Sequence, residues 1–298
     1  MGRPKRIECD VRCAIDSKDA LGESPLWSAS EQALYWVDIL APAIHRWHPS
    51  SGARHTWPMP AAVGSMGLRE GGGWVVALRT GFHLFDTESG ALTLIVNPEP
   101  DLRTNRLNDG KVAPDGSFWA GTMDERPDKE PVASLYRLGV DQRCTRMASG
   151  LKVSNGLAWS PEGRVLYHSD SRAGTIWRYP YQPGNVPLGG RKIFAVMELG
   201  WGRPDGGCTD AEGCYWSCGV SAGRINRFSA KGELLSWIEL PVTHPTMPCF
   251  GGPALKTLYV TSLRQGLSPE QLAVTPLAGG VLEIDLGVAG TPVGHYRG

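Results

Sequence analysis

The chain is built from units such as SNGLAWSPEGRVLYHSDSRAGTIWRYPYQPG, residues 154–184. In this unit a short innermost segment is followed by the turn PEG, an aromatic-rich run and a second apolar run. Side chains in TIWRY, residues 175–179, alternate between two faces, as they do in a strand. Turn signals recur too often for helices of three turns. The unit therefore predicts a small antiparallel sheet.

The same pattern occurs six times along the chain. One position near the start of each unit lies 43, 43, 46, 50 and 45 residues from its counterpart in the preceding unit. This spacing is the length of a four-stranded propeller blade. We therefore expect an all-β fold, a six-bladed β-propeller with four-stranded antiparallel blades. In chain order, the repeated position holds Glu23, Met66, Asp109, Asn155, Asp205 and Phe250.

Both ends of the chain lie outside the six units. They are CDVRCAIDS, residues 9–17, and TPVGHYRG, residues 291–298. If N- and C-terminal strands complete one shared blade, the ring closes and no sheet edge stays open. We expect a single domain over residues 1–298, with residues 1–8 flexible.

Composition and charge narrow the classes of partner. Lys plus Arg equals Asp plus Glu at 30 each, so no net field attracts the protein to nucleic acid or to an anionic membrane. The basic start lacks the apolar run of a secretory signal, and no stretch approaches the length of a membrane span. These features favour a soluble cytosolic protein, a monomer or weak dimer, with a small-molecule ligand.

The seven cysteines are an odd count in a chain without a secretory signal, which argues against a disulfide framework. Cys208, Cys214 and Cys218 could form a soft-metal cluster. However, their spacings do not match paired zinc ligands, and no histidine lies among them. We interpret them as buried or surface thiols.

Recurring tryptophans have two interpretations. They fall at similar points of successive aromatic-rich strands, where large side chains fill the space between splayed blades. An aromatic cage for a cation is the alternative. The recurring position favours packing. The residues are Trp36, Trp74, Trp119 and Trp216.

Oxygen-bearing side chains occupy several of the repeated positions near the expected central channel. Glu23, Asn155 and Asp205 supply carboxylate and amide oxygens, which hard divalent cations prefer. An Asp or Asn before Gly is often only a turn residue, and this applies to Asp109. Turn chemistry does not explain Glu23, which precedes Ser and Pro. The set therefore predicts a metal or ligand site.

The third unit adds possible hydrogen-bond donors. In RLNDG, Arg106 and Asn108 are two residues apart, so they share one side of an extended segment while Asp109 points away. Two such donors suit a hydroxylated, oxygen-rich ligand. Met66 and Phe250 make the second and sixth positions apolar and predict a less polar wall.

Four long strings resemble the SMP-30/gluconolactonase/regucalcin family of sugar lactonases. The resemblance extends from Leu21 to Leu286, and the run PCFGGPALKTLYVTS is similar to bacterial gluconolactonases and xylonolactonases. It implies a six-bladed propeller with one catalytic divalent ion, which could be Ca, Zn, Mn, Mg or Fe. The strings are LGESPLW, RLNDGKVAPDGSFWAGTM, SNGLAWSPEGRVLYHSDS and PDGGCTDAEGCYW.

The resemblance also implies roles for individual residues. Glu23, Asn155 and Asp205 match the metal ligands, with Asp205 as the base, and Asp109 lies outside that set. Arg106 and Asn108 match residues that bind the substrate. The family often has an acidic pair shortly after GTM. Here GTMDER gives Asp124, Glu125 and Arg126, so Glu125 is the candidate for the acid that contacts the substrate.

Together these features predict a gluconolactonase-like ester hydrolase that opens a gluconolactone- or xylonolactone-like aldono-lactone to the aldonic acid. A nucleophilic serine route is disfavoured because the chain has no GxSxG elbow. His168 and Asp170 are plausible pocket residues, although His168 fits packing better than catalysis. The alternative is a calcium-binding regulatory or protein-interaction propeller without catalysis.

Overall fold

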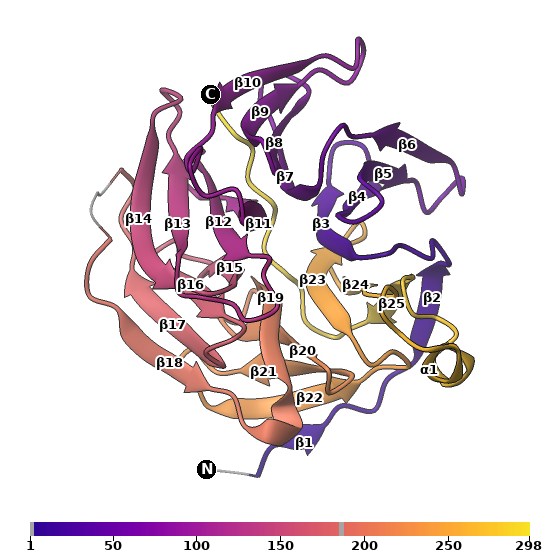
Figure 1. The fold of residues 1–298 in the computed structure, drawn as a ribbon. Coiled ribbons are helices and arrows are strands. Elements are labelled where there is room, and N and C mark those ends of the chain that lie inside the picture. The colour runs from indigo at the N-terminus through magenta and orange to yellow at the C-terminus, as the bar shows by residue number, and fades with distance from the viewer. Residues whose placement is uncertain (1–2, 185–187) are drawn as a thin grey trace.

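The computed structural model describes residues 3–184 and 188–298 as a ring of six antiparallel sheets around a central axis (Figure 1). The first strand of each sheet lies innermost and contacts the innermost strands of the neighbouring blades. This arrangement confirms the predicted six-bladed propeller.

The first three blades follow the chain outward from the axis without crossovers. Each connection within a blade is a short hairpin, as the turn-rich sequence predicts. Blade 1 comprises β3 (Gly22–Ser28), β4 (Ala33–Asp38), β5 (Ala43–Trp47) and β6 (Arg54–Pro58); blade 2, β7 (Val63–Leu68), β8 (Trp74–Leu78), β9 (Gly81–Phe85) and β10 (Leu92–Val96); blade 3, β11 (Asn105–Val112), β12 (Phe118–Asp124), β13 (Ala133–Leu138) and β14 (Cys144–Leu151).

The last three blades repeat this order, and the final blade recruits a strand from the N-terminus. Blade 4 comprises β15 (Ser154–Trp159), β16 (Val165–Asp170), β17 (Thr175–Pro180) and β18 (Lys192–Val196); blade 5, β19 (Arg203–Thr209), β20 (Tyr215–Val220), β21 (Arg224–Phe228) and β22 (Leu234–Glu239); blade 6, β23 (Pro245–Gly251), β24 (Thr257–Ser262), β25 (Val281–Asp285) and β2 (Val11–Ile15).

The ring closes in blade 6, where N-terminal β2 pairs antiparallel with β25, the last strand of the chain. The predicted closure by N- and C-terminal strands is therefore confirmed. Within the range 1–8, for which we expect flexibility, β1 (Lys5–Arg6) runs parallel to β22 and extends blade 5.

The final segment, residues 291–298, does not join blade 6, because β2 already occupies the free edge of β25. It instead crosses one end of the channel to blades 2 and 3 (Figure 1). Tyr296 forms a parallel bridge with Arg69, and its buried hydroxyl donates a hydrogen bond to the Gly139 carbonyl (3.0 Å). The expectation that this segment itself completes the shared blade is wrong.

A change of register interrupts the pairing of the innermost strand with the second strand in all six blades. In blade 1 it lies between Glu23 and Leu26, and in blade 4 between Asn155 and Ala158. Such bulges bend a strand and redirect its side chains. Here they occur next to the repeated polar positions.

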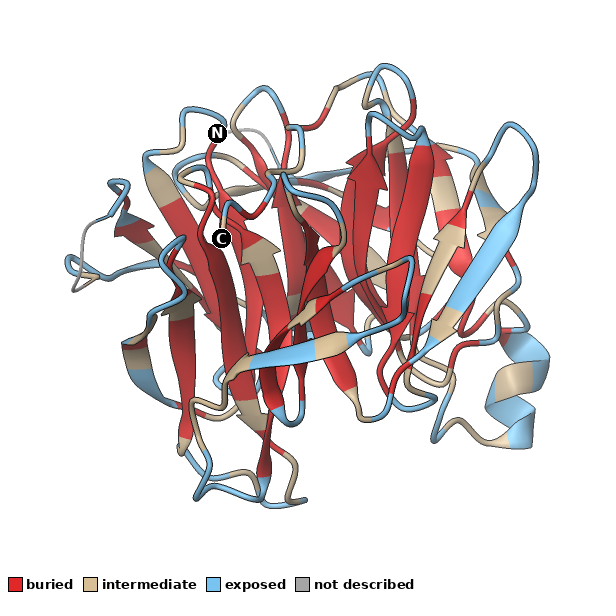
Figure 2. Ribbon diagram, turned by 90° about the horizontal axis from the view of Figure 1, so that it is seen from above, coloured by how far each residue is buried: buried red, intermediate tan, exposed pale blue. Residues whose placement is uncertain are grey.

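Large aromatic side chains fill the space between blades, as the packing interpretation predicts. Trp36, Trp74, Trp119 and Trp216 are all buried on second strands. Figure 2 shows that buried residues follow the strands, whereas exposed residues gather in connecting loops and on α1 (Pro269–Val274).

Helical structure is sparse in the part of the chain that the structure describes. It is limited to α1 and the 3-10 turn η1 (Leu199–Trp201). Neither of these described helices has the length and apolar character needed to cross a bilayer.

The buried C-terminal tyrosine predicts a measurable role for the final segment. We expect Tyr296→Ala to lower the free energy of unfolding by about 3 to 5 kcal/mol, because it leaves a cavity where an aromatic ring was packed. Denaturant unfolding followed by tryptophan fluorescence measures this change. His295→Ala is the matched control, because His295 is exposed on the same segment. Equal effects of the two substitutions would contradict a packing role for the segment.

Candidate functional site

Three of the predicted polar residues lie at the starts of innermost strands from three different blades. Glu23 is on β3, Asn155 is on β15 and Asp205 is on β19. Glu23 and Asn155 are buried, whereas Asp205 is half-buried. Positions that are far apart in sequence therefore meet around the channel.

The carboxylates in this region repel one another electrostatically. Burial, followed by the charges of Asp205 and Asp109, raises the pKa of Glu23. Burial, followed by the charge of Asp109, raises the pKa of Asp205 to about 7. The positive charges that oppose these shifts include Arg106. Three acids therefore share a poorly solvated space without a close ion pair for each.

Asp109 belongs to this group, although sequence reasoning places it outside the metal ligands. Its Oδ2 accepts a hydrogen bond from the Leu157 backbone N–H (2.9 Å), while its buried Oδ1 has no partner among the described residues. The register change between Leu107 and Gly110 explains why Asp109 does not simply point away from the site.

A chain of hydrogen bonds joins blades 3 and 4. Arg106 Nη1 donates to Asn108 Oδ1 (2.7 Å), and Asn108 Nδ2 donates to Asn155 Oδ1 (2.9 Å) and to the Ser154 carbonyl (2.9 Å). Asn155 Nδ2 donates in turn to Ser171 Oγ (2.7 Å). Arg106 and Asn108 thus lie on one side, as the sequence indicates, and Asn108 holds Arg106 and Asn155 in place.

Glu125 lies beside Arg106 and accepts two positive partners. Arg106 Nε is 3.4 Å from Glu125 Oε1, and Arg79 from the loop after β8 donates to Glu125 Oε2. Burial lowers the pKa of Arg106 to about 10. By contrast, Asp124 accepts hydrogen bonds from the Arg126 side chain and from the backbone N–H of Glu130 (2.8 Å). Of Asp124 and Glu125, Glu125 is therefore the acid that pairs with Arg106.

Arg106 also lines a cavity of about 260 Å³ between blades 2 and 3. Its other walls include Arg79, Asn97, Asn105 and Thr122, so hydrogen-bonding groups surround the guanidinium. This cavity provides a polar environment for a hydroxylated ligand. Sequence reasoning missed Arg79, because nothing in the string ALRTG distinguishes it from a surface arginine.

The donor set fits a hard divalent cation. Glu23, Asp109 and Asp205 offer carboxylate oxygens, and burial is the main cause that raises the pKa of each. At Glu23 and Asp205 the charge of neighbouring acids raises the pKa further. The unpartnered Oδ1 of Asp109 is a further acceptor. A bound cation would relieve this repulsion, because it favours the ionised form of each acid.

The apolar positions lie on the other side of the acids. Met66 and Phe250 line a cavity of about 440 Å³, whose far wall is the C-terminal segment at Pro292 and Val293. Its lining does not include the three acids. The predicted less polar wall therefore belongs to a separate part of the channel.

His168 and Asp170 have structural contacts. The fully buried His168 Nε2 is 2.7 Å from Ser154 Oγ, and burial lowers the pKa of His168 to about 3. Asp170 accepts hydrogen bonds from backbone N–H groups in the segments before β15 and after β16, including Lys152 (2.8 Å) and Arg172 (2.9 Å). Both residues fit a packing role.

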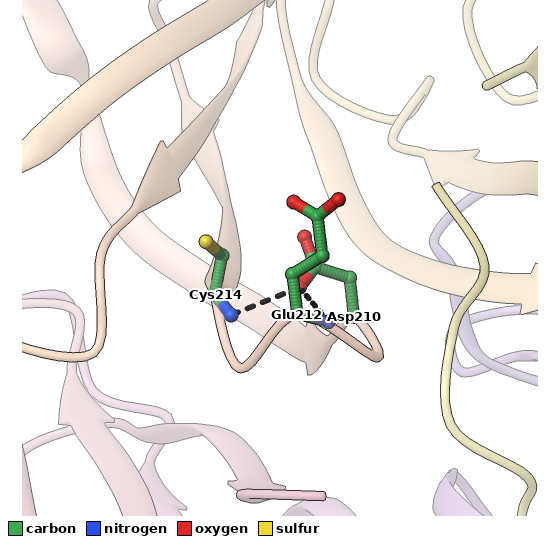
Figure 3. Close-up of side chains that lie close together, drawn as sticks. All are labelled: Asp210, Glu212 and Cys214. Atoms are coloured by element: carbon green, nitrogen blue, oxygen red, sulfur yellow. Dashed lines mark hydrogen bonds between the residues drawn. The ribbon is translucent and has the colours of Figure 1, made fainter. Parts of the chain in front are cut away.

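A second group of possible metal ligands, Asp210, Glu212 and Cys214, lies in the turn between β19 and β20 (Figure 3). Asp210 Oδ1 accepts the backbone N–H groups of Glu212 (3.0 Å) and Cys214 (2.9 Å). Arg227 Nη2 lies 2.7 Å from Asp210 and 2.6 Å from Glu212. Because one guanidinium already neutralises both acids, we interpret this cluster as a stabilised turn. All seven cysteines are free thiols.

Comparisons with known proteins agree on one family. A family model described as the SMP-30/gluconolactonase/LRE-like region matches residues 21–264. The 6-deoxy-6-sulfogluconolactonase of Pseudomonas putida is 41% identical over 281 residues, 94% of this chain and 96% of the relative. Regucalcin of Oryctolagus cuniculus is 34% identical over 97% of this chain and 98% of its own.

The fold is also similar to that of a solved relative. The structure of a calcium-binding protein, regucalcin, from Agrobacterium tumefaciens superposes with a TM-score of 0.93 at 28% identity. The match covers 98% of this chain and 99% of that one. Similarity therefore extends over the whole ring.

The raised pKa of Asp205 predicts how the stability of chelator-treated protein depends on pH. Between pH 3.8 and about pH 7, the carboxyl of Asp205 keeps a proton in the native state that it has lost in the unfolded chain. Native stability therefore falls as pH rises through this window. We expect Asp205→Asn to reduce this fall by up to about 1.4 kcal/mol per pH unit. Urea unfolding at several pH values measures the difference between variant and wild type.

The control for this measurement is Glu162→Gln, which removes an exposed carboxylate in the turn between β15 and β16. We expect the control to keep the wild-type dependence on pH. If Asp205→Asn also keeps it, the pKa of Asp205 is not raised in the native protein as its burial and the nearby Asp109 predict.

Proposed function

Because the chain belongs to the SMP-30/gluconolactonase/LRE-like family, we propose that it is a metal-dependent sugar lactonase. Its substrate is a gluconolactone- or xylonolactone-like aldono-lactone, which it hydrolyses to the aldonic acid. The observation that carries this proposal is the placement of Glu23, Asp109 and Asp205 on innermost strands, near enough to one another and to Arg106 for their charges to interact. A site of this kind combines cation binding with recognition of a sugar.

Glu23, Asn155 and Asp205 would hold one divalent cation, with Asp109 next to them. When bound, the cation supplies Lewis-acid polarisation of the lactone carbonyl, worth several kcal/mol as negative charge develops on its oxygen. Its identity among Ca, Zn, Mn, Mg and Fe depends on coordination geometry as well as on ligand type.

Asp205 is the proposed general base. As a residue it is half-buried, whereas Glu23 and Asp109 are buried. A cation beside it would favour its ionised form, which accepts a proton from the attacking water. The leaving group is the ring oxygen, which takes up the proton that Asp205 has accepted, so hydrolysis opens the lactone and yields the hydroxy acid.

Arg106 and Glu125 are the proposed substrate-binding pair. Arg106 offers donors to the ring oxygens, and Glu125 can accept hydrogen bonds from sugar hydroxyls. Arg79 and Asn108 fix these two side chains from opposite ends. Asn108 uses both amide donors within the site, so its main contribution is to position Arg106 and Asn155.

The second candidate function is a calcium-binding protein without catalysis. Its basis is the similarity to regucalcin, which is named a calcium-binding protein in its Agrobacterium tumefaciens structure. The two functions differ in what Arg106, Glu125 and the polar cavity are for. A binding protein has no need of a substrate cavity beside its cation site.

The lactonase proposal predicts loss of hydrolysis when either of two carboxylates is neutralised. We expect Glu23→Gln and Asp205→Asn each to lower kcat by about a hundredfold or more, because they remove a cation ligand or the base. Acid release from aldono-lactones by chelator-stripped enzyme, supplied with one divalent metal at a time, measures the rate above spontaneous hydrolysis.

Glu212→Gln is the matched control, because it neutralises an acid of the stabilised turn at Asp210 and not of the proposed site. We expect it to retain wild-type hydrolysis. Wild-type rates in both site variants would overturn the proposed site. A wild-type protein that binds Ca²⁺ but opens no lactone would support the binding protein instead.

A further inference from the structure

A basic pocket lies on the rim of the propeller between blades 3 and 4. Its volume is about 410 Å³, and its lining residues are Pro127, Asp128, Lys129, Lys152 and Arg172. Three cationic side chains thus face one carboxylate. Among the described residues, neither Lys152 nor Arg172 forms an ion pair, and Lys129 Nζ donates only to the carbonyls of Asp124 and Arg126. The pocket therefore carries positive charge without a matching set of acids.

The backbone around this pocket is fixed by one buried carboxylate. Asp170 Oδ2 accepts the N–H of Lys152 (2.8 Å), and its Oδ1 accepts those of Val153 (3.2 Å), Arg172 (2.9 Å) and Ala173 (3.3 Å). The backbone of both segments is thus held in place, whereas the side chains of Lys152 and Arg172 have no ion-pair partner among the described residues. Cationic side chains on a backbone that is already fixed suit a bound anion, because less of the chain has to be ordered on binding.

Two lining residues of the pocket, Arg172 and Lys129, lie near residues of the proposed catalytic site. Arg172 follows Ser171, whose hydroxyl accepts a hydrogen bond from Asn155. On the other side, Lys129 is close enough to Arg106 and Glu125 for their charges to affect it. The basic pocket therefore lies close to residues of the proposed site, although its lining does not include Arg106.

We propose that the basic pocket binds a tetrahedral oxyanion on the substrate, a sulfonate or a phosphate, at the end remote from the lactone carbonyl. This inference rests on the proposed lactonase function and narrows its substrate class to anionic aldono-lactones. Lysine and arginine side chains provide several donors that match the three oxygens of such a group. The net charge of the chain is zero, so this attraction is local.

The test compares glucono-1,5-lactone with its 6-phosphate and with the corresponding 6-sulfonate. We expect wild-type enzyme to prefer the anionic lactones. We expect Lys152→Ala combined with Arg172→Ala to lower the ratio of kcat/KM for anionic over neutral lactone by about tenfold or more, chiefly through KM, because charge-assisted hydrogen bonds are lost. The anion with the larger change identifies which group the pocket takes.

Lys192→Ala is the matched control, because Lys192 is an exposed cation on β18 of the same blade. It should leave the ratio unchanged. An unchanged ratio in the double variant, or an equal loss for neutral and anionic lactones, would overturn the anion site.

Binding of the reaction products separates this proposal from the lactonase itself. Calorimetric titration with gluconate and 6-phosphogluconate requires no turnover. We expect wild type to bind the phosphorylated acid more tightly and the double variant to lose that difference. Absence of hydrolysis with this binding preference intact would reject the lactonase alone, whereas hydrolysis without the preference would reject the anion site.

Discussion

Backbone groups at the centre of the ring must find hydrogen-bond partners outside their own blade, and the rest of the site depends on how they do so. Unpaired buried N–H and C=O groups are costly, and the register changes in the innermost strands leave such groups near the axis. Neighbouring blades supply the partners. Ser24 Oγ accepts from Met66 N–H (3.2 Å), Asp109 accepts from Leu157 N–H, and Tyr215 donates to the Gly156 carbonyl (2.9 Å).

This requirement explains why polar residues line the axis, but it does not explain the excess of carboxylates. Asp109 has a structural role, since it satisfies a backbone donor of the next blade. Among the described residues, Glu23 accepts a hydrogen bond only from the adjacent Ser24 N–H (2.9 Å), and its charge opposes that of Asp205. Folding alone would favour a neutral side chain at such a position. Proteins keep residues that are unfavourable for folding mainly at functional or strained sites.

The sequence predicts the parts of the structure that recur with the blade period. Those parts are the number of blades, the strand order and the position of Glu23, Asn155 and Asp205 on innermost strands. It does not predict contacts made once. The C-terminal crossing of Tyr296 and the pairing of Arg79 with Glu125 each join segments with no repeated spacing. The place of Asp109 depends on a bulge, which strict strand alternation cannot reveal.

Comparison of equivalent acids shows where the repeat has diverged. Asp38 and Asp170 each end a second strand and accept backbone N–H groups from both flanking segments. Asp124 ends the second strand of blade 3 but also pairs with the guanidinium of Arg126 (2.9 Å). At blade 3 Arg126 is ion-paired with Asp124, whereas at blade 4 Arg172 has no ion-pair partner among the described residues. The same arrangement of a carboxylate and backbone N–H groups thus recurs in several blades. In blade 4 it is accompanied by an unpaired arginine, which is the basis of the anion site that we propose there.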